Sequence, residues 1–217
     1  MLAGSAFGQG QQYQILKSDR SETFVFPYTA ANMEADIPLT YAYEEPRGPS
    51  WIFTITNNLT YAEGEDSKTV IRLQEPAPSE KFIEIAMYGG DSKQFWVAVN
   101  MPEAGYARLY SQTINGWSKD NAVSLSHVST AGLSVTDGKR IVVDRFDLDG
   151  FNVGSISVYG KDEVSSEDNA VGGTIQFDIL FGSFGDSPLY LVPAIVMAGV
   201  GGLIISLLLF KKRKSSE

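Results

Sequence analysis

The amino-acid sequence predicts an all-β fold: an antiparallel β-sandwich, or a barrel-like body, followed by one C-terminal transmembrane α-helix. Three observations lead to this class. Apolar and polar residues alternate with a period of two in short runs, glycine-containing turn pairs separate these runs, and a long uncharged apolar segment lies near the C-terminus. No window between residues 11 and 181 shows the sustained period of an amphipathic helix.

Four runs show the alternation most clearly, and each places apolar side chains on one face. They span residues 36–43, 50–56, 94–101 and 174–181. Their inward-facing residues are expected to be Ile37, Leu39, Tyr41, Tyr43, Trp51, Phe53, Ile55, Phe95, Val97, Val99, Met101, Ile175, Phe177, Ile179 and Phe181. Further strands are expected at residues 23–28, 69–73, 82–88, 107–111, 123–128, 140–143 and 153–159. Aromatic and β-branched residues dominate these runs, and such residues suit a half-buried pleated surface.

The segments between the runs carry residues typical of tight turns. A loop at residues 89–93 separates two alternating runs, and the pairs Asn115-Gly116, Asp137-Gly138 and Asp149-Gly150 are of the kind that closes β-hairpins. About eleven short strands at this spacing, without helices between them, indicate an antiparallel sandwich or barrel.

Composition excludes several classes of site. The 217 residues include no cysteine, which excludes disulfides, thiolate metal sites and cysteine nucleophiles, and one histidine, which excludes multi-histidine metal sites. Acidic side chains outnumber basic ones by 26 to 17, and the sequence shows no basic patch and no phosphate-binding glycine loop. We therefore expect no nucleic-acid partner.

The chain divides into five parts by composition. Residues 1–10 resemble the remnant of a signal peptide or a disordered N-terminus, 11–181 the extracytoplasmic β-sandwich domain, 182–188 a short juxtamembrane linker, 189–210 the transmembrane helix and 211–217 a basic cytoplasmic tail. The predicted span carries no charge over 22 residues. As a helix it would be roughly 33 Å long, enough to cross a hydrocarbon core of about 30 Å.

The charges that flank the predicted span indicate its orientation. Lys211, Lys212, Arg213 and Lys214 follow the span at once, whereas the residues before it hold 13 basic and 25 acidic side chains, a net charge of −12. The positive-inside rule therefore places the tail in the cytoplasm and the β-sandwich outside it. The alternative is a tail-anchored protein whose β-sandwich is cytosolic.

The predicted span also carries a pattern for helix–helix contact. Ala194, Ala198, Gly202 and Ser206 recur every four residues and form one stripe of small side chains. Such a stripe allows a second helix to approach closely in lipid. We expect the membrane itself as one partner, and other membrane-protein subunits or a second copy of this chain as another.

His127 is the one side chain suited to ligate haem. Strand alternation places it on the apolar face of its strand, with Val123 and Leu125, where a core histidine with a satisfied ring nitrogen is the simpler interpretation. Imidazole paired with a methionine sulfur is a known form of haem ligation, and Met101 and Met87 are candidate second ligands.

Two further ligand sites are suggested by local patterns. Asp144, Asp147 and Asp149 surround a turn that resembles part of an acidic calcium loop, although an arginine occupies the first ligand position. Asn58 begins the triplet Asn-Leu-Thr, an acceptor pattern for N-glycosylation. The simpler interpretation of the acidic turn is a solvated loop.

The three tryptophans differ in their predicted surroundings. Trp51 and Trp96 lie inside alternating strands, where tryptophan usually packs in the core or between sheets. Trp117 lies in a predicted loop and is the candidate for contact with a ligand such as a sugar ring.

Together these patterns predict a single-pass membrane protein whose extracytoplasmic β-sandwich is a binding or accessory subunit of a membrane-associated assembly. Two alternatives remain: a haem-b-binding electron-transfer module that uses His127 and a methionine, and a surface domain that binds carbohydrate or another ligand. We expect no enzymatic activity and no cofactor, with haem b or calcium as the alternatives.

Overall fold

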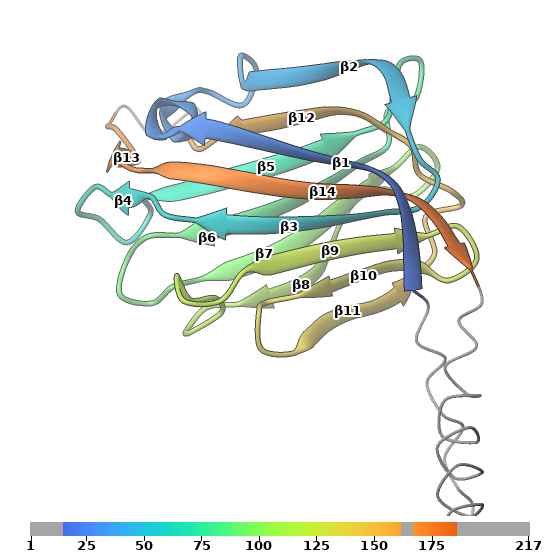
Figure 1. Cartoon of the computed structure of the whole chain (residues 1–217). Coiled ribbons are helices and arrows are strands. Elements are labelled where there is room, and N and C mark those ends of the chain that lie inside the picture. The colour runs from blue at the N-terminus through green and yellow to red at the C-terminus, as the bar shows by residue number, and fades with distance from the viewer. Residues whose placement is uncertain (1–14, 162–166, 186–217) are drawn as a thin grey trace, which may run out of the picture. The chain divides into compact units, whose positions relative to one another are not determined.

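The computed structural model describes residues 15–161 and 167–185, and it divides the chain into two compact units. Residues 18–183 form the larger unit, and residues 1–17 and 184–217 form the other. The larger unit consists of two six-stranded antiparallel sheets that pack face to face (Figure 1). The predicted all-β sandwich is confirmed.

The strands fall into three groups. The first sheet contains, in spatial order, β1 (Ile15–Pro27), β14 (Thr174–Gly185), β3 (Trp51–Asn57), β9 (Val123–Val128), β10 (Gly132–Thr136) and β11 (Ile141–Phe146). The second contains β2 (Leu39–Arg47), β12 (Val153–Tyr159), β5 (Lys68–Gln74), β6 (Phe82–Tyr88), β7 (Phe95–Met101) and β8 (Gly105–Gln112). β4 (Thr60–Tyr61) pairs with β13 (Ala170–Gly172), and η1 (Tyr28–Asn32) is a short 3-10 helix.

One hydrophobic core lies between the two sheets. Trp51, Phe53 and Ile55 on β3 face Ile85 and Val97 of the second sheet across it, and all are at most 2% exposed. The predicted inward faces of β3 and β14 are confirmed, as are the first three inward residues of β7. The apolar faces of these strands therefore form the core, as the period-two pattern predicts.

The predicted inward face of β2 is largely wrong. Of the four apolar residues predicted to face inward, only Tyr43 is buried; Leu39 and Tyr41 are 38% and 40% exposed, and Ile37, which precedes β2, is 59% exposed. β2 is an edge strand that pairs with β12 on one side only, so few side chains of neighbouring strands cover it. Alternation shows which residues share a face, but not whether a second layer covers that face.

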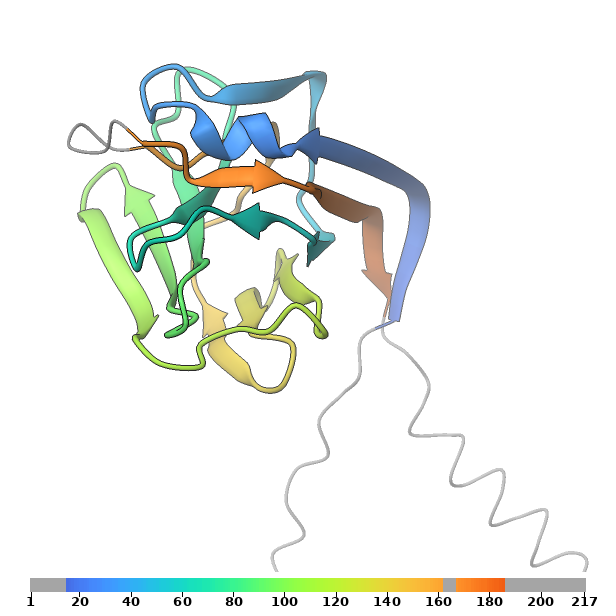
Figure 2. The same ribbon diagram turned by 90° about the vertical axis from the view of Figure 1, so that its left-hand side faces the viewer.

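Three strands were not expected from the sequence, namely β4, β10 and β13. They contain two, five and three residues, too few for an alternating pattern to be seen. β14 also continues four residues beyond Phe181, through part of the segment expected to be a linker (Figure 2). At the predicted turn between β10 and β11, Gly138 has a φ of 88°, a backbone conformation that favours glycine.

Among residues 15–161 and 167–185, the structure contains no helix whose length and apolar character would suit a membrane span. The predicted span at 189–210, its stripe of small residues, the basic tail and residues 1–10 lie outside the described residues.

Candidate functional site

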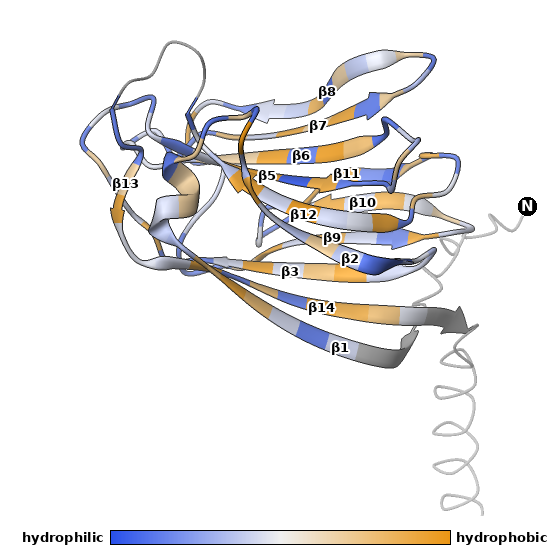
Figure 3. Cartoon of the chain, turned by 90° about the horizontal axis from the view of Figure 1, so that it is seen from above, coloured by the Kyte–Doolittle hydropathy of each residue, from blue (hydrophilic) through white to orange (hydrophobic). Residues whose placement is uncertain are grey.

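The outer face of the second sheet carries an unusual concentration of aromatic and charged side chains. On β5 to β8 every second residue points away from the core, and the strand register aligns these residues in rows. We call the following group the aromatic–arginine face: Arg72, Phe82, Glu84, Trp96, Tyr106, Arg108 and Tyr159. Figure 3 shows β8, β7, β6 and β5 side by side, with hydrophilic positions interrupting the hydrophobic ones.

A buried carboxylate organises the centre of this face. Glu84 is 4% exposed, and three donors converge on its Oε1 atom. The Nε and a terminal nitrogen of Arg72 each lie 2.7 Å from Oε1, and the Tyr159 hydroxyl donates a hydrogen bond to the same atom. Burying a carboxylate is costly unless it is paired and hydrogen-bonded, and this cluster provides both.

Arg72 is held by ring contacts as well as by Glu84. Its guanidinium carbon lies 4.6 Å from the centre of the Phe82 ring and 5.2 Å from that of Tyr159. A terminal nitrogen also donates to the Tyr159 hydroxyl at 3.1 Å. Burial, followed by the charge of Glu84, raises the pKa of Tyr159, so the phenol stays protonated and can donate.

A second arginine lies nearer the edge of the sheet. The Arg108 guanidinium stacks over the Trp96 ring at 5.0 Å, and Arg108 itself is exposed. The rings of Phe82 and Tyr106 are 6.2 Å apart, and Tyr106 is 50% exposed. Rings and guanidinium planes therefore form a continuous layer from β12 to β8.

Tyr106 connects the two halves of this layer electrostatically. Burial raises the pKa of its hydroxyl, the charge of Glu84 raises it further, and Arg108 acts in the opposite direction. Both charged groups therefore lie close enough to act on the same phenol. The face combines ring surfaces with fixed hydrogen-bonding groups, an arrangement suited to a ligand with both apolar and hydroxyl surfaces.

The structure reverses the roles predicted for two tryptophans. Trp117 was the predicted ligand contact, but it is 4% exposed; its indole nitrogen donates to the Tyr88 carbonyl at 2.9 Å, and its ring packs against Tyr61. Trp96, expected in the core or between the sheets, lies on the outer face, where it is partly buried and packs against the cluster of Val70, Ala86 and Tyr159. Its neighbours Phe95 and Val97 are fully buried, and alternation already places Trp96 opposite them. This parity was the signal that could have identified the face.

His127 is placed as the core interpretation predicts. It is 1% exposed, its Nδ1 donates to the Pro49 carbonyl at 2.6 Å, and its ring stacks on Trp51 at 5.6 Å. Burial lowers the pKa of the imidazole, and the Pro49 carbonyl opposes this shift.

The structure does not bring His127 and Met87 together. His127 pairs with Trp51 at the start of β3, whereas Met87 lies 3.6 Å from Asn57 at the end of the same strand. Six residues of strand separate these positions, or roughly 20 Å. Met101 is partly buried at the margin of the core, on β7 of the other sheet.

The backbone carbonyls of the acidic turn bind the ammonium group of Lys81. Lys81 donates from Nζ to the carbonyls of Leu148 and Asp149 at 3.0 and 3.1 Å and reaches that of Gly150 at 3.5 Å. Asp147 accepts a hydrogen bond from the Asp149 backbone N–H at 2.8 Å. Asp144, on β11, lies 3.9 Å from the guanidinium of its neighbour Arg145. Among the described residues, no group of three or more metal-ligating side chains gathers in one place.

Asn58 is exposed and follows the last residue of β3, while the next residue, Leu59, is fully buried. The backbone N–H of Asn58 donates to the Thr174 carbonyl at 3.0 Å, so the Asn58 backbone is fixed while its side chain stays accessible. The structure thus leaves room for the predicted glycan at Asn58.

Comparison with known proteins gives matches only among solved structures. No protein-family model matches the chain, and no curated protein matches it. A glycosidic hydrolase is 9% identical, with 68% of this chain and 71% of that chain covered and a TM-score of 0.46. A prokaryotic β-1,3-1,4-glucanase from a mouse hindgut metagenome is 11% identical, with 67% and 71% covered and a TM-score of 0.42. The Crh5 transglycosylase is 9% identical, with 85% and 82% covered and a TM-score of 0.42.

All three of these structures are of enzymes, and they contradict the prediction that this chain is not an enzyme. At such low identities the likeness is one of sandwich fold. It carries neither a substrate nor the role of any residue over to this chain.

Proposed function

We propose that this chain binds carbohydrate through the aromatic–arginine face of its second sheet. The observation that carries the proposal is that aromatic rings surround a cluster of hydrogen-bonded polar side chains, Arg72, Glu84 and Tyr159, on this face. This corresponds to the ligand-binding alternative predicted from the sequence. The proposed site is the outer face of the sheet that carries Trp96, and not the loop that contains Trp117.

The chemistry of a sugar ring matches the two components of this face. A pyranose has apolar C–H surfaces that pack against aromatic rings, and Tyr106 offers the most exposed ring on the face. Its hydroxyls need donors and acceptors held in fixed directions. Arg72 is held in place by Glu84 and Tyr159, so it can donate without first losing side-chain freedom.

The test is binding of a panel of oligosaccharides to the full chain in detergent, measured by calorimetry. Tyr106→Ala and Trp96→Ala should each weaken the best binder about tenfold, since a well-packed ring contributes on the order of 1 kcal/mol or more. Tyr28→Ala is the control, because Tyr28 is an exposed ring in η1, outside this face. Unchanged affinity in both variants of the face would contradict the proposal.

The same samples also test for catalysis. Mass spectrometry of the oligosaccharides after incubation detects cleavage or transfer of sugar units. Glu84 is the buried carboxylate of the face, so turnover that is lost in Glu84→Gln while binding persists would place this carboxylate in the reaction.

We further propose that the sandwich is held at a membrane with its body outside the cytoplasm. The uncharged segment at 189–210 and the basic residues 211–214 support this location. Within the membrane, the stripe that includes Gly202 supports contact with a second helix, from another subunit or a second copy.

A further inference from the structure

The two arginines of the aromatic–arginine face differ in how their charges are balanced. Arg72 lies against Glu84 at 2.7 Å, so its charge is paired within the protein. Arg108 makes no salt bridge with any carboxylate in residues 15–161 and 167–185. An arginine without a salt bridge to a carboxylate is notable in a chain whose formal net charge is −9, where acidic groups are in excess.

The position of Arg108 leaves its hydrogen-bonding edge open. Its guanidinium carbon lies over the Trp96 ring, 5.0 Å from the ring centre, and the residue is exposed. Guanidinium N–H groups lie in the plane of the group, so stacking on a ring occupies none of them. The Trp96 contact therefore orients the arginine, and the donors that do not interact with the Tyr106 hydroxyl remain available to a ligand.

We infer that the saccharide bound on this face is acidic, with a uronic acid carboxylate that pairs with the edge of Arg108 while a sugar ring packs against Tyr106. This inference rests on the proposed carbohydrate-binding function and names its ligand class. Tyr106 and Arg108 both project from the outer side of β8, near its pairing with β7, so one sugar unit can contact both.

A carboxylate suits this arginine better than a neutral hydroxyl or a sulfate ester. Two carboxylate oxygens match two parallel guanidinium donors, and such charge-assisted pairs are about twice as strong as neutral hydrogen bonds. A sulfate ester can also offer two oxygens to these donors, but it is a much weaker base than a carboxylate and accepts weaker hydrogen bonds. The surrounding negative charge of the protein should also disfavour anions that lack this specific pairing.

The experiment measures binding of three matched probes to the full chain in detergent. The probes are oligouronide tetramers of glucuronate, galacturonate and mannuronate, the same tetramers after reduction of their carboxyl groups to alcohols, and sulfated forms of the reduced tetramers. We expect at least one oligouronide to bind roughly tenfold or more tightly than its reduced form, since a hydrogen bond to a charged group contributes about 1.5–3 kcal/mol.

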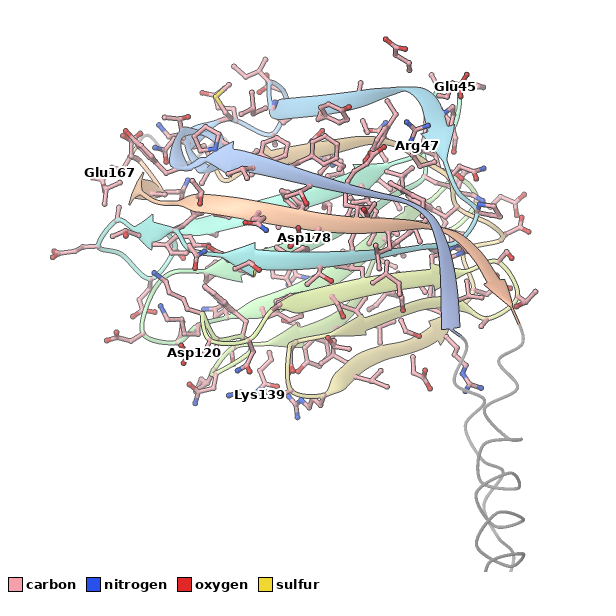
Figure 4. All side chains as sticks on the ribbon, viewed as in Figure 1. Glu45, Arg47, Asp120, Lys139, Glu167 and Asp178 are labelled. Atoms are coloured by element: carbon pink, nitrogen blue, oxygen red, sulfur yellow. The ribbon has the colours of Figure 1, made fainter. Side chains whose placement is uncertain are left out.

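Variants then assign this difference to Arg108. Arg108→Gln should remove the preference for the oligouronide, because the paired charge is lost while the rings remain, and it should weaken binding of the oligouronide more than that of the reduced tetramer. Arg108→Lys should retain part of the preference. Lys139→Gln is the control, since Lys139 is an exposed cation in the turn before β11 of the other sheet, labelled in Figure 4.

The outcomes separate the inference from the function on which it rests. Equal binding of acidic and reduced tetramers, with loss of both in Tyr106→Ala, would overturn the acidic ligand and support carbohydrate binding. Tighter binding of the sulfated tetramers would overturn the carboxylate. If no member of either sugar panel binds, the proposed function itself fails. Circular dichroism and a melting curve check that each variant is folded.

Discussion

Two buried polar residues show how single side chains are satisfied in this protein. Glu84 accepts hydrogen bonds from Arg72 and Tyr159 at one carboxylate oxygen. His127 instead is buried between Trp51 and Phe151 with one ring nitrogen bonded to a backbone carbonyl, and burial lowers its pKa. The first is therefore satisfied by side-chain donors, and the second is favoured in its neutral form.

We predict that stability depends on pH through His127. Because the folded state has the lower pKa, the unfolded state binds the proton first, and stability should fall as the pH drops below about 6.5. It should be fully present above that value. Urea unfolding at about pH 7.5 and about pH 5.5 measures the change.

The variant His127→Phe is the comparison for this measurement. It retains a ring against Trp51 but cannot titrate, so it should be less stable at neutral pH and show a flatter dependence between those two values. An equally steep loss in the variant would mean that other groups cause it.

Sequence patterns predicted the surroundings of some single residues correctly and those of others wrongly. The alternation around His127 placed it correctly in the core, because its strand lies in the middle of a sheet with a second layer above it. Trp117 and Trp96 were assigned to the wrong surroundings. Loop residues such as Trp117 can fold back against the core, and nothing in a local pattern shows where a loop returns.

At the scale of elements, the strands followed their patterns where both neighbours were present. β3 and β14 pair along seven residues, and their inward residues are all buried. The acidic turn differs from the predicted calcium site because of a contact with a residue that is distant in sequence. Lys81 precedes this turn by more than sixty residues and supplies the cation that its carbonyls bind. Sequence spacing around Asp147 could not show this contact.

We predict that the two faces of β14 differ sharply in their effect on stability. Phe177 is fully buried and packs edge-on against Phe26 at 5.4 Å, so Phe177→Ala should cost about 3–5 kcal/mol. Gln176→Ala, on the outer face, should change the free energy of unfolding by about 0.5 kcal/mol or less. Chemical denaturation of both variants compares them, and similar losses would refute the strand register.

At the scale of the whole molecule, composition and periodicity were enough to predict a sandwich but not its ligand. The aromatic–arginine face is assembled from β5, β6, β7 and β8, which follow one another through short loops, and from β12, which comes much later in the chain. Tyr159 reaches Glu84 across 75 positions of sequence. Only the order of strands in the sheet brings such residues together, and that order follows from packing of the entire core.

The proposed membrane location makes a prediction for the full chain. Protease added to intact cells should digest the sandwich and spare the tail, because residues 211–214 are expected to remain in the cytoplasm. Antibodies against the two regions report the result on a gel. Full protection of the sandwich in cells shown to be sealed would support the tail-anchored alternative.

The place of β14 in the first sheet has a consequence for biosynthesis. This last strand lies between β1, the first, and β3, so neither of those strands has its full set of neighbours until residue 185 has been made (Figure 2). Pairing of strands so distant in sequence is slow, because a long loop must be closed before any contact rewards it. We therefore expect the emerging chain to carry an incomplete sheet with unpaired edges until β14 is made, a state in which aggregation competes with folding.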